Sequence, residues 1–414
     1  MRPKTSPVWR TFRIAAAALS LGFAGSLNQS PNAQEAATAF EAARVIVGDG
    51  RTVENATIVV SGGRIAQVGP SATVQVPAGA MRVNLAGKTV MPTIVDTHVH
   101  LSTAREALLT DLRRRAHFGV GAAMSLGLDP PGEVFKVRAE APAGVARYFT
   151  AGRGITLPEP GRSDVPYWVT TEAEARQAVR DQAALNVDVI KVWVDDRDGK
   201  YKKMPPAIYA AVIDEAHKAK LRVAAHIFNL SDAKGLLQAG IDAFAHGIRD
   251  MDIDDELVSL ISARKQVVLI PNMPDRGVAA DYSWLKGSVL DAELAKIQAA
   301  STDRPQVQAT WGIQARNLKR LSEAGVTIAL GTDGNIAWAP HVEMADMVAA
   351  GMTPMQVIVA ATRNGAEFLR MNDAGTLATG KSADFLVLDG NPAEDITNTR
   401  KISAVYLKGV KVER

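Results

Sequence analysis

Residues 90–330 repeat one pattern, in which short apolar runs alternate with amphipathic, helix-prone stretches. The eight runs cover residues 90–95, 120–126, 146–150, 187–194, 221–227, 241–245, 266–271 and 326–330. Thr171 and Glu172 supply a cap and a first-turn acid to the helix-prone stretch 172–185, without a capping box by spacing alone. Eight strand–helix units favour an α/β fold of the (β/α)₈ TIM-barrel type, distorted in detail. An open doubly wound sheet is the alternative, but no Gly-x-Gly-x-x-Gly turn follows a first strand.

Both ends of the chain contain short β-rich runs separated by turns. Such runs cover residues 43–47, 56–60, 64–68, 383–388 and 402–407. Neither end alone can bury both faces of a sheet. We therefore expect residues 40–90 and 374–414 to form one composite β-sandwich domain, with the barrel spanning residues 91–373.

The first 26 residues are typical of a secretory signal peptide, with cleavage there or as late as residue 33. Four basic residues precede the apolar stretch 14–25, which is short for a bilayer span. We therefore expect an exported protein, periplasmic or extracellular, with no stable membrane anchor after cleavage. A retained N-terminal anchor is the alternative.

The net charge and the cysteine content limit the classes of binding partner and of catalytic or metal site that this chain can have. Removing residues 1–26 takes away four basic residues and no acid, so the formal net charge changes from +3 to −1. A nearly neutral body gives no electrostatic case for nucleic acid, so a small-molecule substrate is the expected partner, and a homo-oligomer is compatible with the sequence. The chain has no cysteine, which excludes disulfides, thiolate metal sites and a cysteine nucleophile. Any metal must be held by His, carboxylate or modified Lys.

Four of the seven histidines lie at the ends of expected strands. His98 and His100 follow the first strand, His226 lies in the fifth near its end, and His246 follows the sixth. The C-terminal strand ends of a barrel meet at one mouth, where active sites lie. Residues i and i+2 of a strand point to one side, so His98 and His100 can face one ion together.

Lys191 and Asp333 complete this group. Lys191 lies inside the otherwise apolar run 187–194, where an ammonium needs a partner, a lowered pKa or a modification. An amine with a lowered pKa can react with carbon dioxide to form a carbamate, an anionic oxygen ligand. Asp333 follows the eighth strand, next to the first in a closed barrel. A single buried histidine is usually a packing residue, but six suitable residues at five strand ends indicate a metal site.

These motifs resemble those of the amidohydrolase superfamily of metal-dependent hydrolases, and the imidazolonepropionase-like and prolidase-like groups in particular. Asp96-Thr97-His98-Val99-His100 is similar to the opening His-x-His motif of that family. Lys191, His226, His246 and Asp333 match its remaining metal positions in chain order. The C-terminal stretch 381–392 is similar to its β-domain signature. Members that act as peptidases usually carry a Tyr-Ser element where this chain reads Lys202-Lys203-Met204, which weakens a simple dipeptidase assignment.

The resemblance implies a metal centre and a mechanism. His98, His100, carboxylated Lys191 and Asp333 would hold one divalent ion, and Lys191, His226 and His246 a second. Two Zn²⁺ ions are expected, and Mn²⁺ or Fe²⁺ also suit these ligands. A metal-bound hydroxide would attack a carbonyl, with Asp333 as general acid/base, and cleave the C–N bond of an N-acyl amino acid, dipeptide or cyclic amide.

Three further features near the expected mouth of the barrel each allow two interpretations. Arg249 is a candidate for binding a substrate carboxylate or, equally, for a salt bridge with Asp250 or Asp252. His341 is a substrate-binding candidate or simply the start of a helix. Residues 273–305 form a lid or an extra surface helix. Two other functions also stay open, an esterase or lactonase that uses the same metal site and an exported metal-binding protein without catalysis.

Overall fold

The computed structural model describes residues 37–414, and the predicted signal peptide lies outside these residues. Among the described residues, no helix has the combination of length and apolar character that a membrane crossing needs.

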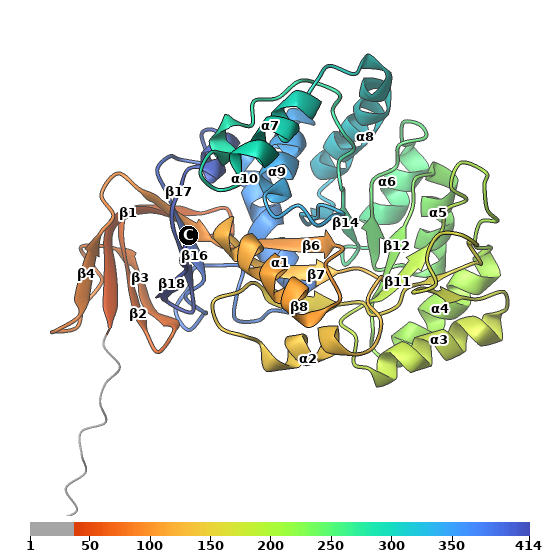
Figure 1. The fold of residues 1–414 in the computed structure, drawn as a ribbon, viewed down its shortest axis with the longest axis horizontal. Helices are drawn as coiled ribbons and strands as arrows, with labels where there is room; N and C mark the ends of the chain where they lie inside the picture. The colour runs from red at the N-terminus through yellow and green to blue at the C-terminus, as the bar shows by residue number, and fades with distance from the viewer. Residues whose placement is uncertain (1–36) are drawn as a thin grey trace, which may run out of the picture. The chain divides into compact units, whose positions relative to one another are not determined.

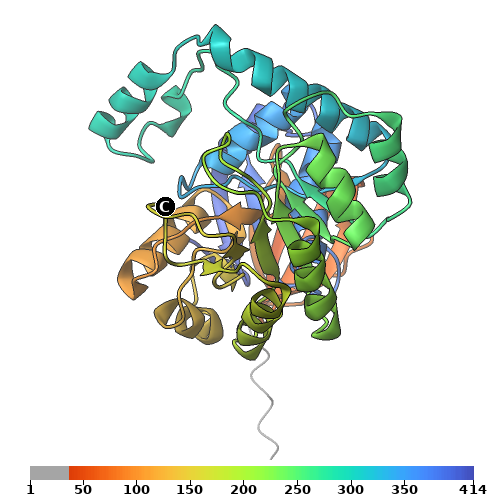
Figure 2. The same cartoon turned by 90° about the vertical axis from the view of Figure 1, so that its right-hand side faces the viewer.

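Eight parallel strands form a TIM barrel, as predicted. They are β6 (Ile94–Val99), β7 (Val120–Ser125), β8 (Arg147–Thr150), β11 (Ile190–Trp193), β12 (Val223–His226), β13 (Ala243–Ala245), β14 (Val268–Ile270) and β15 (Thr327–Ile328). The strands β6 to β8 form one sheet and the strands β11 to β15 belong to another. Two backbone hydrogen bonds join these sheets into a closed barrel, from Asp188 N–H to Thr150 O and from Thr97 N–H to Leu330 O, each 2.9 Å long. The arrows of β6 and β7 point to the right in Figure 1, so Figure 2 views the barrel from its C-terminal strand ends.

Helices on the outside bury their apolar sides against these strands. They are α1 (Arg105–His117), α2 (Glu133–Glu140), α3 (Glu172–Ala184), α4 (Pro206–Lys218), α5 (Leu230–Ala239), α6 (Asp255–Ser262), α8 (Pro305–Glu323), α9 (Ala339–Ala349), α10 (Pro354–Val359) and α11 (Gly365–Phe368). The short strands β9 (Ile155–Thr156) and β10 (Tyr167–Trp168) extend the sheet beside β11. The expectation of no capping box at α3 is wrong, because Thr171 Oγ1 accepts from Glu174 N–H while the Glu174 side chain bonds back to Thr171 N–H.

Strands from both chain ends share a second sheet. Its members are β1 (Thr38–Ile46), β2 (Thr52–Ser61), β3 (Arg64–Pro70), β4 (Met81–Asn84), β5 (Thr89–Pro92), β16 (Phe385–Leu388), β17 (Ile402–Leu407) and β18 (Val410–Lys411). β5 lies between β1 and β16, and Phe40 packs edge-on against Phe385 and Tyr406. The arrangement of this sheet as a sandwich and the exact domain limits stay predictions.

The expected first barrel strand, residues 90–95, has the wrong limits. Residues 89–92 pair with β1 and β16 in the second sheet, and the barrel strand runs from Ile94 to Val99. A continuous apolar run concealed this boundary, because β5 and β6 are both fully buried.

Residues 273–305 form the 3₁₀-helix η1 (Ser283–Leu285) and the helix α7 (Asp291–Ala300). Leu285 is fully buried against Phe118 and Ala337, and Phe118 lies just before β7 begins. Their apolar anchor is therefore near the N-terminal strand ends, opposite the mouth. This part of the segment is an extra surface element rather than a lid.

Candidate metal centre and active site

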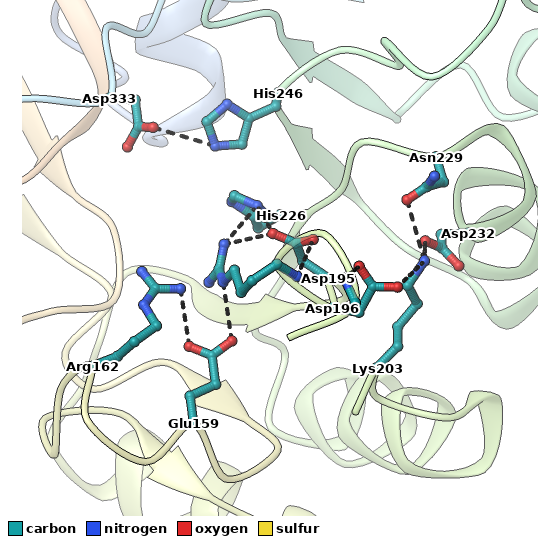
Figure 3. Close-up of polar contacts among 12 residues, drawn as sticks. Glu159, Arg162, Asp195, Asp196, Lys203, His226, Asn229, Asp232, His246 and Asp333 are labelled. Carbon is teal, nitrogen blue, oxygen red and sulfur yellow. Dashed lines mark hydrogen bonds and ion pairs between the residues drawn. The ribbon is translucent and has the colours of Figure 1, made fainter. Parts of the chain in front are cut away.

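The predicted site residues lie at the C-terminal ends of the barrel strands. Strand β6 contains His98 and is followed by His100, β11 contains Lys191, β12 ends at His226, and His246 and Asp333 follow β13 and β15. Each strand is short and buried, so the side chains at its end are fixed by the barrel itself. Figure 3 shows Asp333, His246 and His226 in this region.

Asp333 is the point at which three histidines meet. Its Oδ1 lies 3.1 Å from His98 Nε2 and 3.0 Å from His100 Nε2, and its Oδ2 lies 3.5 Å from His246 Nε2. Burial raises the pKa of Asp333, but the interactions with His98 and His100 outweigh burial and hold this pKa below the usual range. Asp333 is therefore an anion, and its left-handed backbone (φ 54°) aims it at the histidines.

The donor set fits a divalent metal ion. Ligand atoms of His98, His246 and Asp333 all lie within 4.8 Å of one another. Burial lowers the pKa of His98 to about 4 and the pKa of His246 well below its usual range, so both imidazoles are neutral, as metal ligation requires. His246 Nε2 is buried and has no hydrogen-bond partner among residues 37–414, which leaves its lone pair for an ion.

Lys191 is fully buried, and within the described chain its Nζ has no hydrogen-bond partner. Burial lowers its pKa to about 7, because the favourable charge interaction with Asp333 only partly offsets desolvation. Two glycines make room for it, since a Cβ at Gly127 would come within 2.8 Å of Lys191 Cγ and one at Gly154 would overlap the ring of Trp193. A buried amine with a substantial neutral fraction near pH 7 fits the predicted carbamate.

His98 and His226 each contact a polar side chain that is not among the predicted metal ligands. Asn272 Oδ1 lies 2.9 Å from His98 Nδ1. Asp195 Oδ2 lies 3.0 Å from His226 Nε2, and Figure 3 shows these two side chains together. Arg197 Nη1 forms an ion pair with Asp195 Oδ2. The sequence gives no signal for Asn272, an isolated amide after β14. Asp195 and Arg197 follow the run 187–194, and this position in the sequence does not by itself give them a role.

A fully buried ion pair braces the turn that carries Asp333. Arg115 Nη1 donates to Asp96 Oδ2 at 3.0 Å, and Arg115 Nη2 donates to Gly334 O at 2.9 Å. Asp96 also accepts from the Thr332 hydroxyl (2.7 Å) and from the backbone N–H of Thr332 (3.1 Å). The pair therefore grips both sides of Asp333. A charged residue inside an apolar strand, two positions before His98, was the available signal for it.

A family model described as Amidohydrolase family matches residues 89–412 of this chain. The chain belongs to this family. It is therefore a hydrolase that acts on carbon–nitrogen bonds, and the family generally uses a divalent metal.

Relatives of this amidohydrolase have several names. The imidazolonepropionase of Deinococcus radiodurans is 26% identical over 394 residues, covering 88% of this chain and 94% of the relative. The ochratoxinase of Aspergillus niger is 27% identical over 434 residues, covering 89% and 84%. A crystal structure from Bifidobacterium longum with a provisional prolidase name has a TM-score of 0.76 and 28% identity, covering 92% of this chain and 95% of that one.

Arg249 lies in the wall of the amidohydrolase site. Its guanidinium carbon is 3.3 Å from the centre of the Phe228 ring, which lies 4.5 Å from the ring of His226. The salt bridge considered for it is not formed, since Asp250 accepts from Asn229 and from the backbone of Leu230 while Asp252 pairs with Arg316.

The structure places His341 outside the site. It is buried in α9, with Nδ1 3.1 Å from Thr399 Oγ1 and Nε2 2.9 Å from Phe118 O. Both ring nitrogens are therefore engaged near the N-terminal strand ends, and a substrate-binding role is wrong for this residue. His217, in α4, contacts Asp242 at the surface.

Proposed function

We propose that this amidohydrolase cleaves an amide or peptide-like bond in a small substrate that carries a carboxylate, such as an N-acyl amino acid, a dipeptide or a cyclic amide. The guanidinium of Arg249 carries the proposal. No residue in the range 37–414 accepts a side-chain hydrogen bond from it or forms an ion pair with it. Burial lowers its pKa, with Asp195 and Asp333 near enough to oppose that change.

A half-buried guanidinium without an acceptor has a substantial desolvation cost, which an anion in the site would offset. Its planar pairs of N–H groups match the two oxygens of a carboxylate. Phe228 holds the group flat beside His226 and His246, so a carboxylate bound there would leave the rest of a small substrate near Asp333.

The protein residues divide the remaining tasks. His98, His100, Lys191 and Asp333 would hold one divalent ion, and Lys191, His226 and His246 a second, with a carbamate on Lys191 adding anionic oxygens. Zinc suits these ligands, and when bound it supplies Lewis acidity and acidifies a water molecule. Asp333, held as an anion, accepts a proton from the attacking water and delivers it to the leaving nitrogen.

A substrate panel tests the proposal. N-acyl amino acids and dipeptides are compared with matched compounds whose carboxylate is blocked as an amide. Arg249→Met should raise KM about 10- to 100-fold for the carboxylate compounds only, because a charge-assisted pair contributes roughly 1.5–3 kcal/mol. The control is Arg222→Met, which removes a guanidinium stacked on Phe368 next to the N-terminal end of β12. Equal effects on blocked and free substrates would contradict the role of Arg249.

The same panel separates the alternatives. Faster turnover of lactones than of any amide would favour an esterase or lactonase. A metal-loaded protein that turns over nothing, and that keeps its metal in Asp333→Asn, would favour a metal-binding protein without catalysis.

We also propose that the protein is exported, on the basis of its N-terminal residues. Fractionation of cells that express the full chain tests this. Recovery of the uncleaved chain in the cytoplasm would contradict it.

A further inference from the structure

Two metal-ligand candidates are bonded to neighbouring residues through different ring nitrogens. His98 uses Nδ1 toward Asn272 Oδ1, and His226 uses Nε2 toward Asp195 Oδ2. We propose that Asn272 and Asp195 are positioning residues, and that each one fixes the tautomer of the metal-ligand candidate that it contacts, His98 for Asn272 and His226 for Asp195.

For His98, the argument begins from the amide oxygen of Asn272, which can only accept. At 2.9 Å it requires a proton on His98 Nδ1, and a neutral ring then has its lone pair on Nε2. That lone pair faces Asp333 Oδ1 at 3.1 Å. Two acceptors at this distance repel each other unless a cation lies between them, which is the arrangement a metal site needs.

For His226, three atoms form a tight triangle. Asp195 Oδ2 lies 2.6 Å from Arg197 Nη1 and 3.0 Å from His226 Nε2, and the two nitrogens are 3.2 Å apart. A carboxylate only accepts and a guanidinium only donates. With a proton on Nε2, both nitrogens donate to the same oxygen; without it, the Nε2 lone pair would face the carboxylate. The proton therefore belongs on Nε2, and Nδ1 keeps the lone pair.

Asp195 is itself held in place. Arg197 Nε donates to Glu159 Oε1 at 3.1 Å, and Arg162 bonds the other oxygen of Glu159 at 3.1 Å (Figure 3). Arg197 also has a left-handed backbone, with φ 56°, a conformation that persists only where surrounding contacts enforce it. These contacts hold the Asp195 carboxylate in place beside His226.

Nuclear magnetic resonance of the metal-free, isotope-labelled protein reads the tautomers directly. We expect a proton on Nδ1 of His98 and on Nε2 of His226. The reverse assignment at either ring would overturn the proposal. This measurement involves no substrate, so it can fail or succeed independently of the proposed function, on whose metal site the inference rests.

Variants at Asp195 test its role. In Asp195→Ala, the remaining polar neighbour of Nε2 is the donor Arg197 Nη1, so the proton should move to Nδ1 and Zn²⁺ affinity should fall about 10- to 100-fold. Asp195→Asn keeps an accepting oxygen and should retain the tautomer and most of the affinity. The control is Asp196→Ala, whose carboxylate contacts Gly199 and Lys203 instead.

Unchanged Zn²⁺ affinity in Asp195→Ala, measured by calorimetry, would overturn the proposal, as would an equal loss in Asp196→Ala. If Asp195→Ala does not fold, the wild-type spectrum and the Asn variant still decide.

Discussion

Replacing Arg115 with Met should destabilise this protein far more than removing any surface arginine. Arg115 and Asp96 are both fully buried, and Arg115 also donates to the backbone of Gly334. Met fills much of the same volume without a charge or a donor, so the variant isolates the loss of the pair.

The expected loss in the free energy of unfolding depends on the hydrogen bonds that Asp96 keeps in the variant. Removing one partner of a buried pair costs about 3–5 kcal/mol, because the other charge stays buried. Asp96 keeps its hydrogen bonds from Thr332, so we expect the lower end, about 3 kcal/mol. Burial raises the pKa of Asp96 even with Arg115 present. A raised folded-state pKa means that stability is lost as pH rises, so the defect should be smallest in acid and grow toward neutral pH.

Urea unfolding of the metal-free protein measures this effect. The control is Arg316→Met, which breaks an exposed pair with Asp252 and should cost under about 1 kcal/mol. Adding Asp96→Asn to Arg115→Met should recover part of the loss, since it removes the uncompensated charge. If Arg115→Met is no worse than Arg316→Met, or if Asp96→Asn makes it worse at neutral pH, the account of the buried pair is incorrect.

Further predictions concern the site and one remote carboxyl. Lys191→Ala should be inactive but partly recover with added short carboxylic acids, which replace the carbamate oxygens; an equal response in wild type would contradict this. Ala at His98 or His226 should lower metal content, measured by elemental analysis, and abolish turnover, so retained metal at full rate would refute the site. Burial raises the pKa of Asp346 to about 7, so its stability contribution is lost between about pH 4 and 7, and Asp346→Asn should gain stability over wild type across that window in pH-dependent melting.

Much of this site could be predicted from sequence because a barrel brings strand ends together. His98, His226, His246 and Asp333 are far apart in the chain, but each ends or follows a short buried run. Once the runs are recognised as barrel strands, the meeting of these residues follows from topology alone.

The rest depends on contacts that leave no periodic pattern. Asn272 and Asp195 reach their histidines from loops with left-handed residues, φ 43° at Asn272 itself and 56° at Arg197. Nothing in the composition of such loops fixes where their side chains point. The substrate-binding role considered for His341 was wrong because it depended on closeness in sequence to Asp333. In the structure, α9 directs the His341 side chain toward Phe118 and Thr399.

The position of β5 has a consequence for how the chain folds during synthesis. Every predicted metal ligand has been made by residue 333, but β5, which runs directly into the first barrel strand, pairs on one side with β16 at residues 385–388. Until those residues leave the ribosome, β5 remains an open strand edge joined to an otherwise complete barrel, a state prone to wrong pairing. A chain shortened before residue 385 should therefore contain all the metal ligands and still aggregate.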